Sequence, residues 1–178
     1  MPSLQAGADI RPAGSGRKGT GVNAHPDTAD ATTKIAAATR GDRLTELGNA
    51  YLAERGIGAL GEKMGIVFTE FTAERAVATM PVEGNTQPIG LLHGGAYVVL
   101  GESLGSMHAN LIAPEGMVAV GIDINATHTS SATSGIVTGG CTPLQTGRSL
   151  TVHEIVVTDE RGRRCSTIRI TNLYKPAK

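Results

Sequence analysis

Residues 91–112 read LLHGGAYVVLGESLGSMHANLI, and this stretch determines how the rest of the chain can be arranged. It contains no proline, which would interrupt an α-helix, and it is mostly apolar between Tyr97 and Leu104. We therefore predict that most of Leu92–Ile112 forms one long helix. A helix this apolar has to be covered by other parts of the chain.

The flanking sequence supplies strands to cover it, because apolar and polar residues alternate there. Within the strand predicted after the helix, Val118, Val120, Ile122 and Ile124 are expected to share one side. The predicted strands are Met64–Thr72, Arg75–Val82, Met117–Thr129, Ile136–Leu144, Ser149–Thr158 and Arg164–Tyr174.

Shorter segments connect these elements. Asp42–Gly56 has apolar residues at helical spacing and a glycine at its end, so it predicts a second helix. Ile57–Gly61 is expected to be a short connection, Glu83–Leu91 a loop, and Asp159–Gly162 a hairpin turn. Short links between adjacent strands imply antiparallel pairing. The predicted fold is α+β, with an antiparallel sheet wrapped around one long central helix.

The composition limits the classes of function. The chain has 178 residues, the size of one domain with a tail, and its 16 basic residues balance its 16 acidic ones. Neutral charge and an aromatic content of 3% argue against nucleic-acid binding. No apolar run is long enough to span a membrane. We expect a cytoplasmic protein, with a disordered N-terminal extension over residues 1–41 and one domain over residues 42–178.

Gly94 and Gly95 stand where the long helix is expected to begin. Backbone N–H groups in a first helical turn have no helical partner, and they point along the positive end of the helix dipole. Such donors suit a carbonyl oxygen that gains negative charge during acyl transfer. Glycine also lets a ligand approach the backbone closely. The alternative is that the two glycines only permit tight packing of loop and helix.

Glu102 is the carboxylate inside the apolar helix, and Ser106 and Asn110 follow it at one-turn intervals on the same face. Burying a lone charge is costly, so a functional interpretation makes Glu102 a base or a nucleophile. The alternative is a solvated edge of the helix. Gly101 and Gly105 lie one turn apart, and we expect them to let the helix approach the sheet closely.

Two other kinds of catalytic site are not expected. Gly101–Gly105 matches the G-x-S-x-G pattern of serine hydrolases, and His153 with Asp123 or Asp159 would complete a triad. That pattern needs a parallel sheet with crossover helices, which the hairpin-linked strands exclude. No metal site is expected, because His93 and His128 lack a third ligand and the two cysteines lack a zinc spacing.

Arg148 and Ser149 stand before a predicted strand, where an arginine could grip a phosphate and a serine could add a hydrogen bond. The alternative is a solvated hairpin arginine.

Several motifs together resemble the hotdog-fold acyl-CoA thioesterases. The likeness is to the branch with the Arthrobacter-type 4-hydroxybenzoyl-CoA and phenylacetic-acid-type thioesterases. Within that branch, the sequence is most similar to the enzymes for 1,4-dihydroxy-2-naphthoyl-CoA in menaquinone synthesis and for proofreading in enterobactin synthesis. The motifs that carry the resemblance are Gln87–Gly95, Val98–Ser106, Val120–Ala126, Thr142–Leu144 and Asp159–Cys165.

The resemblance implies roles for residues that match the family's motifs. Glu102 would be the catalytic carboxylate, Gln87 would orient the nucleophile or thioester, and His93 would support the loop. The Gly94 N–H would polarise the thioester carbonyl, and Ser106 would supply the helix hydroxyl. The residues expected to contact the substrate or its CoA are Gly95, His128, Arg148 and Ser149.

The resemblance also implies a reaction: hydrolysis of an acyl-CoA, with an aromatic acyl group such as hydroxybenzoyl or dihydroxynaphthoyl, without metal or redox cofactor. It implies a homodimer or homotetramer with shared active sites. One departure is Ser130, where that branch tends to carry an arginine near CoA. A hotdog enoyl-CoA hydratase or dehydratase and a non-catalytic acyl-CoA-binding module remain alternatives.

Overall fold

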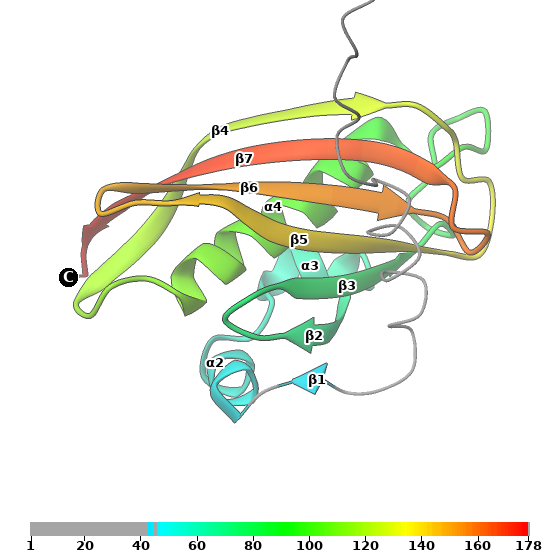
Figure 1. The fold of residues 1–178 in the computed structure, drawn as a ribbon. Helices are drawn as coiled ribbons and strands as arrows, with labels where there is room; N and C mark the ends of the chain where they lie inside the picture. Colours follow the sequence, from blue (N-terminus) through cyan, green and yellow to red (C-terminus); the bar gives the residue numbers. More distant parts are fainter. Residues whose placement is uncertain (1–42, 45, 178) are drawn as a thin grey trace, which may run out of the picture.

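The computed structural model describes residues 43–44 and 46–177, so the predicted disordered extension lies outside the described residues. α4 is the long central helix, and it follows three strands and two short helices (Figure 1). The elements are β1 (Arg43–Leu44), α2 (Glu46–Arg55), α3 (Gly58–Lys63), β2 (Val67–Phe71), β3 (Ala76–Pro81), α4 (Gly94–Leu111), β4 (Met117–His128), β5 (Ile136–Thr146), β6 (Leu150–Thr158) and β7 (Arg164–Pro176).

The strands form one sheet in the order β1-β2-β3-β5-β6-β7-β4. All neighbouring strands in this order pair antiparallel, except that the two-residue β1 joins β2 in parallel. The sheet curves around α4, which lies against one of its faces (Figure 1). The predicted architecture, an antiparallel sheet around a central helix, is therefore confirmed.

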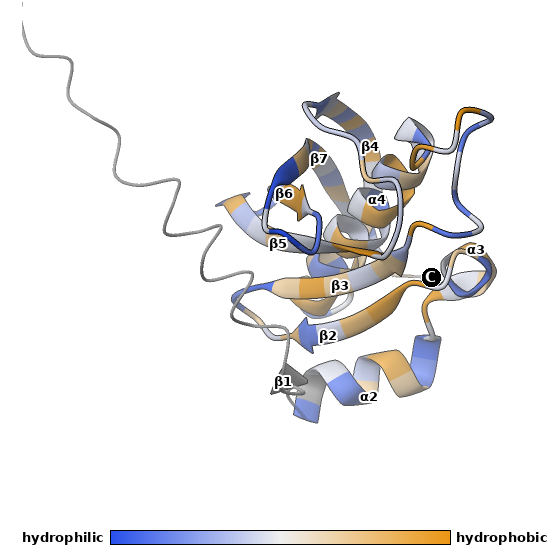
Figure 2. Cartoon of the chain, turned by 90° about the vertical axis from the view of Figure 1, so that its right-hand side faces the viewer, coloured by the Kyte–Doolittle hydropathy of each residue, from blue (hydrophilic) through white to orange (hydrophobic). Residues whose placement is uncertain are grey.

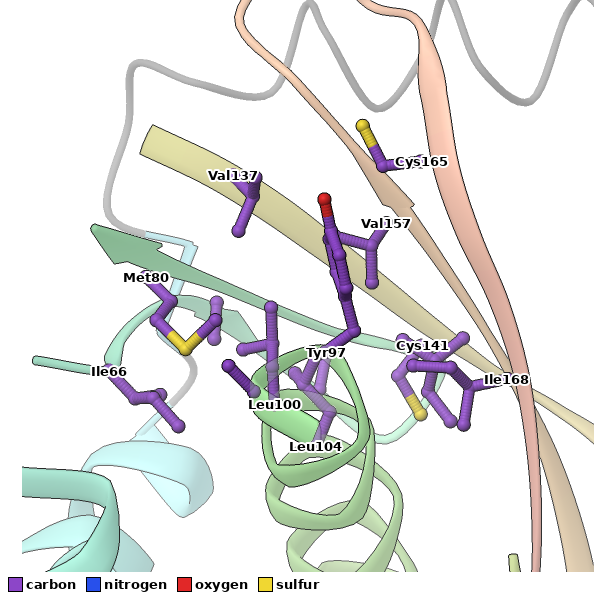
Figure 3. Close-up of a cluster of buried hydrophobic side chains, with 14 of the residues drawn as sticks. Ile66, Met80, Tyr97, Leu100, Leu104, Val137, Cys141, Val157, Cys165 and Ile168 are labelled. Atoms are coloured by element: carbon purple, nitrogen blue, oxygen red, sulfur yellow. The ribbon is translucent and has the colours of Figure 1, made fainter. Parts of the chain in front are cut away.

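The core lies between α4 and the sheet. Tyr97, Leu100 and Leu104 point from the helix toward the strands, and all three are buried (Figure 3). Burying a leucine or isoleucine contributes roughly 1.5–3 kcal/mol, so this layer supplies much of the driving force for folding. Apolar residues also predominate along β2 and β3 (Figure 2).

Gly101 and Gly105 permit the close contact between α4 and β7, as predicted. A Cβ atom added to Gly101 would stand 2.7 Å from Ile168 Cδ1, and a Cβ on Gly105 would overlap Ile170. Any side chain at either position would push the helix away from the sheet. The energetic cost of glycine in a helix is accepted here because it lets two layers pack.

The structure differs from the sequence-based prediction before β2. The predicted connection Ile57–Gly61 instead contains helix α3, and the preceding helix begins at Glu46 rather than at Asp42. Two glycines in six residues give α3 a low intrinsic helix propensity. Ile57 and Met64, at its two ends, pack against the core, and this tertiary contact favours the helix.

The predicted alternation in β4 is wrong because the strand contains a bulge. The pairing of β4 with β7 shifts between Gly121 and Asp123. Before the bulge, Ala119 is buried whereas Val120 is 42% exposed. After it, Ile124 packs against the core. A single extra residue thus changes which positions face α4.

Candidate active site

The loop before α4 is fixed by hydrogen bonds. The Asn85 side chain donates to the carbonyls of Met64 and Pro81, both at 2.9 Å, and the Asn85 carbonyl accepts from the His93 N–H at 2.9 Å. His93 is the N-cap, and its Nδ1 accepts from the Gly95 N–H at 2.8 Å. Neutral His93 therefore carries its proton on Nε2. The Gly95 N–H is occupied, so the prediction of two free glycine donors holds only for Gly94.

Gly94 is the first residue of α4, and its N–H donates to no other described residue. His128, at the end of β4, lies against it: an added Cβ on Gly94 would stand 3.1 Å from His128 Nε2. The other ring nitrogen of His128, Nδ1, is 3.0 Å from Ser166 Oγ. We refer to His93, Gly94 and His128 as the Gly94 cluster. It combines a free backbone donor with an imidazole at the positive end of a helix dipole.

Tyr97, on the first turn of α4, packs against the His128 ring of this cluster. Its ring centroid is 5.2 Å from that of His128, and its hydroxyl accepts from the Ala132 N–H at 3.2 Å. Burial raises the pKa of Tyr97 to about 12, so the phenol stays neutral at physiological pH. Tyr97 thus holds the His128 ring without adding a charge.

Glu102 lies about two helical turns after Gly94 on α4, and its side chain is half-buried. The Ser106 hydroxyl is 2.8 Å from Glu102 Oε1 and 3.1 Å from Oδ1 of Asn172, a buried residue of β7. Gly121 of β4 faces the carboxylate, because an added Cβ would stand 2.9 Å from Glu102 Oε1. We refer to Glu102, Ser106 and Asn172 as the Glu102 cluster. The predicted shared face of Glu102 and Ser106 is confirmed.

Asn110 fastens α4 to β4 beside this cluster. Its amide nitrogen donates to the carbonyls of Ser106 and Ala119, at 2.9 and 3.0 Å, and its oxygen accepts from the Ala119 N–H at 2.9 Å. All three contacts are to the backbone. Asn110 therefore sets the spacing between helix and strand and is not available to a ligand.

Gln87 lies in the loop before α4, where its backbone closes a turn. The Gln87 N–H donates to the Leu91 carbonyl, and the Gln87 carbonyl accepts from the Gly90 N–H. Its half-buried side chain forms no hydrogen bond with the residues that the structure describes. The turn thus leaves the Gln87 amide available to a ligand or to another chain.

Arg148 and Ser149 lie in the hairpin between β5 and β6, and both are exposed. Leu150 pairs with Leu173, and Leu173 pairs with Val120, the neighbour of Gly121. The hairpin thus lies at the same end of the sheet as the Glu102 cluster. The Gly94 cluster lies further along β4, where His128 ends the strand.

A groove of about 520 Å³ runs beside the first two turns of α4. Its apolar wall consists of Leu60, Met64, Ala96 and Val99, and His93 and Gly95 also line it. Lys63, from α3, contributes a cation. A volume of this size is within the range of small-molecule sites.

The serine-hydrolase pattern at Gly101–Gly105 is interior to α4, so Ser103 does not stand on a strand-to-helix turn. His153 is committed elsewhere, because its Nε2 is 2.9 Å from Nδ1 of His108. Both histidines are fully buried, and burial lowers the pKa of each, that of His153 to about 4. Sequence reasoning did not identify the contact between His108 and His153 or the role of Asn172, because no local motif marks either contact.

Comparison with known proteins identifies the family. Residues 89–166 match the model of the thioesterase superfamily. The chain is 50% identical over 108 residues to the proofreading thioesterase EntH of Klebsiella pneumoniae, an alignment that covers 60% of this chain and 79% of that protein.

Solved structures agree with this assignment. A thioesterase of Haemophilus influenzae superposes with a TM-score of 0.67 at 34% identity, over 76% of this chain and 94% of that one. A thioesterase of Pseudomonas aeruginosa gives the same TM-score at 35% identity, over 78% and 98%. None of the described helices is long and apolar enough to cross a membrane. The family match, the identity to the proofreading thioesterase and the two superpositions show that the chain belongs to the thioesterase superfamily and has its hotdog fold.

Proposed function

We propose that the protein hydrolyses an acyl-CoA thioester to the free acid and CoA, with an active site completed by a second copy of the chain. The observation that carries this proposal is the pair of clusters along β4, one beside Gly121 near the middle of the strand and one beside His128 at its end. One offers a free N–H at a helix N-terminus, and the other offers a half-buried carboxylate. Hydrolysis of a thioester needs both kinds of group near one carbonyl.

A single chain does not bring these groups together. Glu102 follows Gly94 by eight positions on α4, which separates their Cα atoms by about 12 Å along the axis and roughly 80° around it. β4 is the last strand of the sheet, and its outer edge pairs with no described strand. Antiparallel pairing of β4 with the same strand of a second copy would extend the sheet and protect this edge.

The sequence positions on β4 suggest the register of that pairing. If it is centred between Ile124 and Asn125, Gly121 stands opposite the partner's His128. Paired strands lie about 4.8 Å apart, so Glu102 approaches the partner's Gly94. Two equivalent sites then arise from the two-fold symmetry. We accordingly propose a homodimer, or a tetramer of two such dimers.

In this arrangement the thioester carbonyl accepts a hydrogen bond from the Gly94 N–H, which stabilises the oxyanion of the tetrahedral intermediate. Glu102 of the other subunit either attacks the carbonyl carbon or removes a proton from an attacking water. The acyl–sulfur bond breaks, the acyl group gains hydroxyl from water, and the CoA sulfur leaves as thiolate and takes a proton. The proposed reaction uses water and no further cofactor.

The groove beside Gly95 suits the acyl group. Its apolar wall and volume fit a single- or double-ring aromatic acyl such as hydroxybenzoyl or dihydroxynaphthoyl. Lys63 would lie near a phenolic oxygen on such a ring. Arg148 and Ser149 would contact the phosphates of CoA from the subunit that supplies Glu102. Gln87, in the loop before α4, would orient the thioester.

The test is release of thiol, followed with dithionitrobenzoate, from a panel of acetyl-, decanoyl-, benzoyl-, 4-hydroxybenzoyl- and 1,4-dihydroxy-2-naphthoyl-CoA. The proposal predicts turnover of aromatic acyl-CoAs and its loss in Glu102→Ala. Binding of these compounds without thiol release would instead identify a binding module. Hydration of an enoyl-CoA without thiol release would identify a hydratase.

The assignment of the groove has its own test. Val99→Trp fills it from the helix side, so kcat/KM for benzoyl-CoA should fall at least about tenfold, whereas acetyl-CoA, which needs less room, should react at nearly the original rate. Equal losses for both substrates would place the acyl group elsewhere.

A further inference from the structure

Asn172, in the Glu102 cluster, has a buried amide nitrogen without a hydrogen-bond partner among the described residues. The residue is fully buried on β7. Its Oδ1 is 3.1 Å from Ser106 Oγ, which is itself 2.8 Å from Glu102 Oε1. Buried amide groups without partners are rare in folded proteins.

Counting donors shows how the three side chains fit together. A serine hydroxyl has one proton, so Ser106 does not donate to both Glu102 and Asn172. The two ends of an asparagine amide have nearly the same shape. Turning the Asn172 amide by 180° lets Nδ2 donate to Ser106 Oγ, while Ser106 donates to the Glu102 carboxylate. Each of these two bonds then has one donor and one acceptor.

Neither of the two neighbouring polar side chains forms a hydrogen bond with Asn172. Thr151 lies beside it on β6, but its hydroxyl donates to the Gln145 carbonyl at 2.8 Å. Asn110 is committed to backbone groups of Ser106 and Ala119. Within the described part of the chain, Ser106 is the side chain whose hydrogen-bond contact with Asn172 the structure shows.

We propose that Asn172 is a positioning residue for hydrolysis, acting through Ser106 on Glu102. Its amide fixes the Ser106 hydroxyl so that the proton points to Glu102 Oε1. The carboxylate is thereby held facing Gly121 on β4, the strand that would meet the second subunit. Binding of substrate does not involve Asn172, which is buried beneath the carboxylate. This inference rests on the proposed role of Glu102 as the catalytic carboxylate.

We refer to the chain of contacts from Asn172 through Ser106 to Glu102 as the relay. It predicts a specific pattern of kinetic effects. Asn172→Leu keeps the branched shape and the number of heavy atoms of the side chain and removes its hydrogen bonds. We expect kcat to fall about 3- to 10-fold, the effect of one net hydrogen bond, with KM unchanged. In a Ser106→Ala background the relay is already broken, so adding Asn172→Leu should cause no further loss of kcat. Such non-additivity marks residues that act through one another.

Thr151→Val is the matched control. It removes a buried hydrogen bond next to Asn172 without touching Ser106. It should lower the melting temperature as Asn172→Leu does, but leave kcat at the original value. If Asn172→Leu does not give folded protein, Asn172→Ala, which leaves a small cavity, serves in the same cycle.

The experiment separates failure of the relay from failure of the proposed function. If Glu102→Ala abolishes turnover but Asn172→Leu leaves kcat unchanged, or lowers it equally with and without Ser106, the relay is wrong and the catalytic carboxylate stands. If Glu102→Ala retains activity within threefold, the proposed function of Glu102 fails, and the relay fails with it.

Discussion

Gly94 and Glu102 lie on the same helix, but eight positions apart, so their Cα atoms are about 12 Å apart along the helix axis. Each has its own set of neighbours: Gly94 adjoins His128 at the end of β4, and Glu102 adjoins Gly121 near the middle of the same strand. This separation is the reason we propose that each active site is shared between two subunits.

The carboxylate of Glu102 should be essential. Glu102→Ala is expected to reduce kcat at least about 100-fold, because it removes a general base or nucleophile. Glu115→Ala, an exposed position in the turn before β4, is the control and should retain full activity. Activity within threefold of the original in Glu102→Ala would exclude Glu102 as the catalytic group. Single-turnover hydrolysis in ¹⁸O-labelled water would distinguish direct attack, which places label in the carboxylate, from activation of water.

The backbone donor of Gly94 can be removed selectively. Proline is tolerated at the first position of a helix, and His93 already has the extended backbone, φ −64° and ψ 135°, that precedes proline. Gly94→Pro should lower kcat by about 100-fold, the usual effect of losing one oxyanion donor. Gly94→Ala adds a Cβ against His128 but keeps the N–H, so it measures the steric contribution alone. Equal rates for the two variants would mean that the N–H has no catalytic role.

Arg148 should affect substrate affinity and not the chemical step. It is exposed in the β5–β6 hairpin, far from the reacting carbonyl in the proposed complex. Arg148→Ala should raise KM for CoA thioesters about tenfold or more and leave kcat nearly unchanged. The increase should shrink with a pantetheine thioester, which lacks the nucleotide, and at high salt. Arg169→Ala, another exposed arginine, is the control. An unchanged KM would identify Arg148 as a solvated turn residue.

The buried pair His108 and His153 should make stability depend on pH. His108 Nε2 donates to the Thr72 carbonyl at 3.1 Å, so its Nδ1 accepts from His153 Nε2, and both rings are neutral. Burial lowers the pKa of His153 from its ordinary 6.5 to about 4. The unfolded chain therefore takes up a proton first, and stability that is complete above about pH 6.5 is lost as the pH falls toward 4.

Melting temperatures measured between pH 7.5 and 4.5 test this pair. The original protein should lose stability steadily below pH 6.5, and His153→Asn should lose less, because one titrating group is absent. An identical pH dependence in the two proteins would show that other residues cause the acid sensitivity.

Much of the fold could be predicted because local patterns and packing agree. The alternating strands and the apolar stretch around Tyr97 and Leu104 required an antiparallel sheet around a helix. The bulge at Gly121–Asp123 could not be predicted, because the sequence of β4 is compatible with regular alternation. Helix α3 was missed for a different reason: its glycines disfavour a helix, and the contacts that favour it come from distant residues.

The candidate site was predictable only in part. Glu102 and Ser106 share a helix face, so their contact followed from spacing alone. Asn172 is 66 residues from Ser106 in sequence, and only the pairing of β7 brings it to the helix. The occupied Gly95 N–H depended on a His93 rotamer that no sequence pattern specifies.

The central claim is that each active site combines Gly94 of one subunit with Glu102 of the other. Gly94→Pro and Glu102→Ala chains with different affinity tags can be coexpressed, and mixed dimers isolated by two successive purifications. In a mixed dimer one of the two sites has both groups intact, so we predict about half of the original activity per dimer, although each parent is nearly inactive. Mixed dimers no more active than their parents would contradict the account.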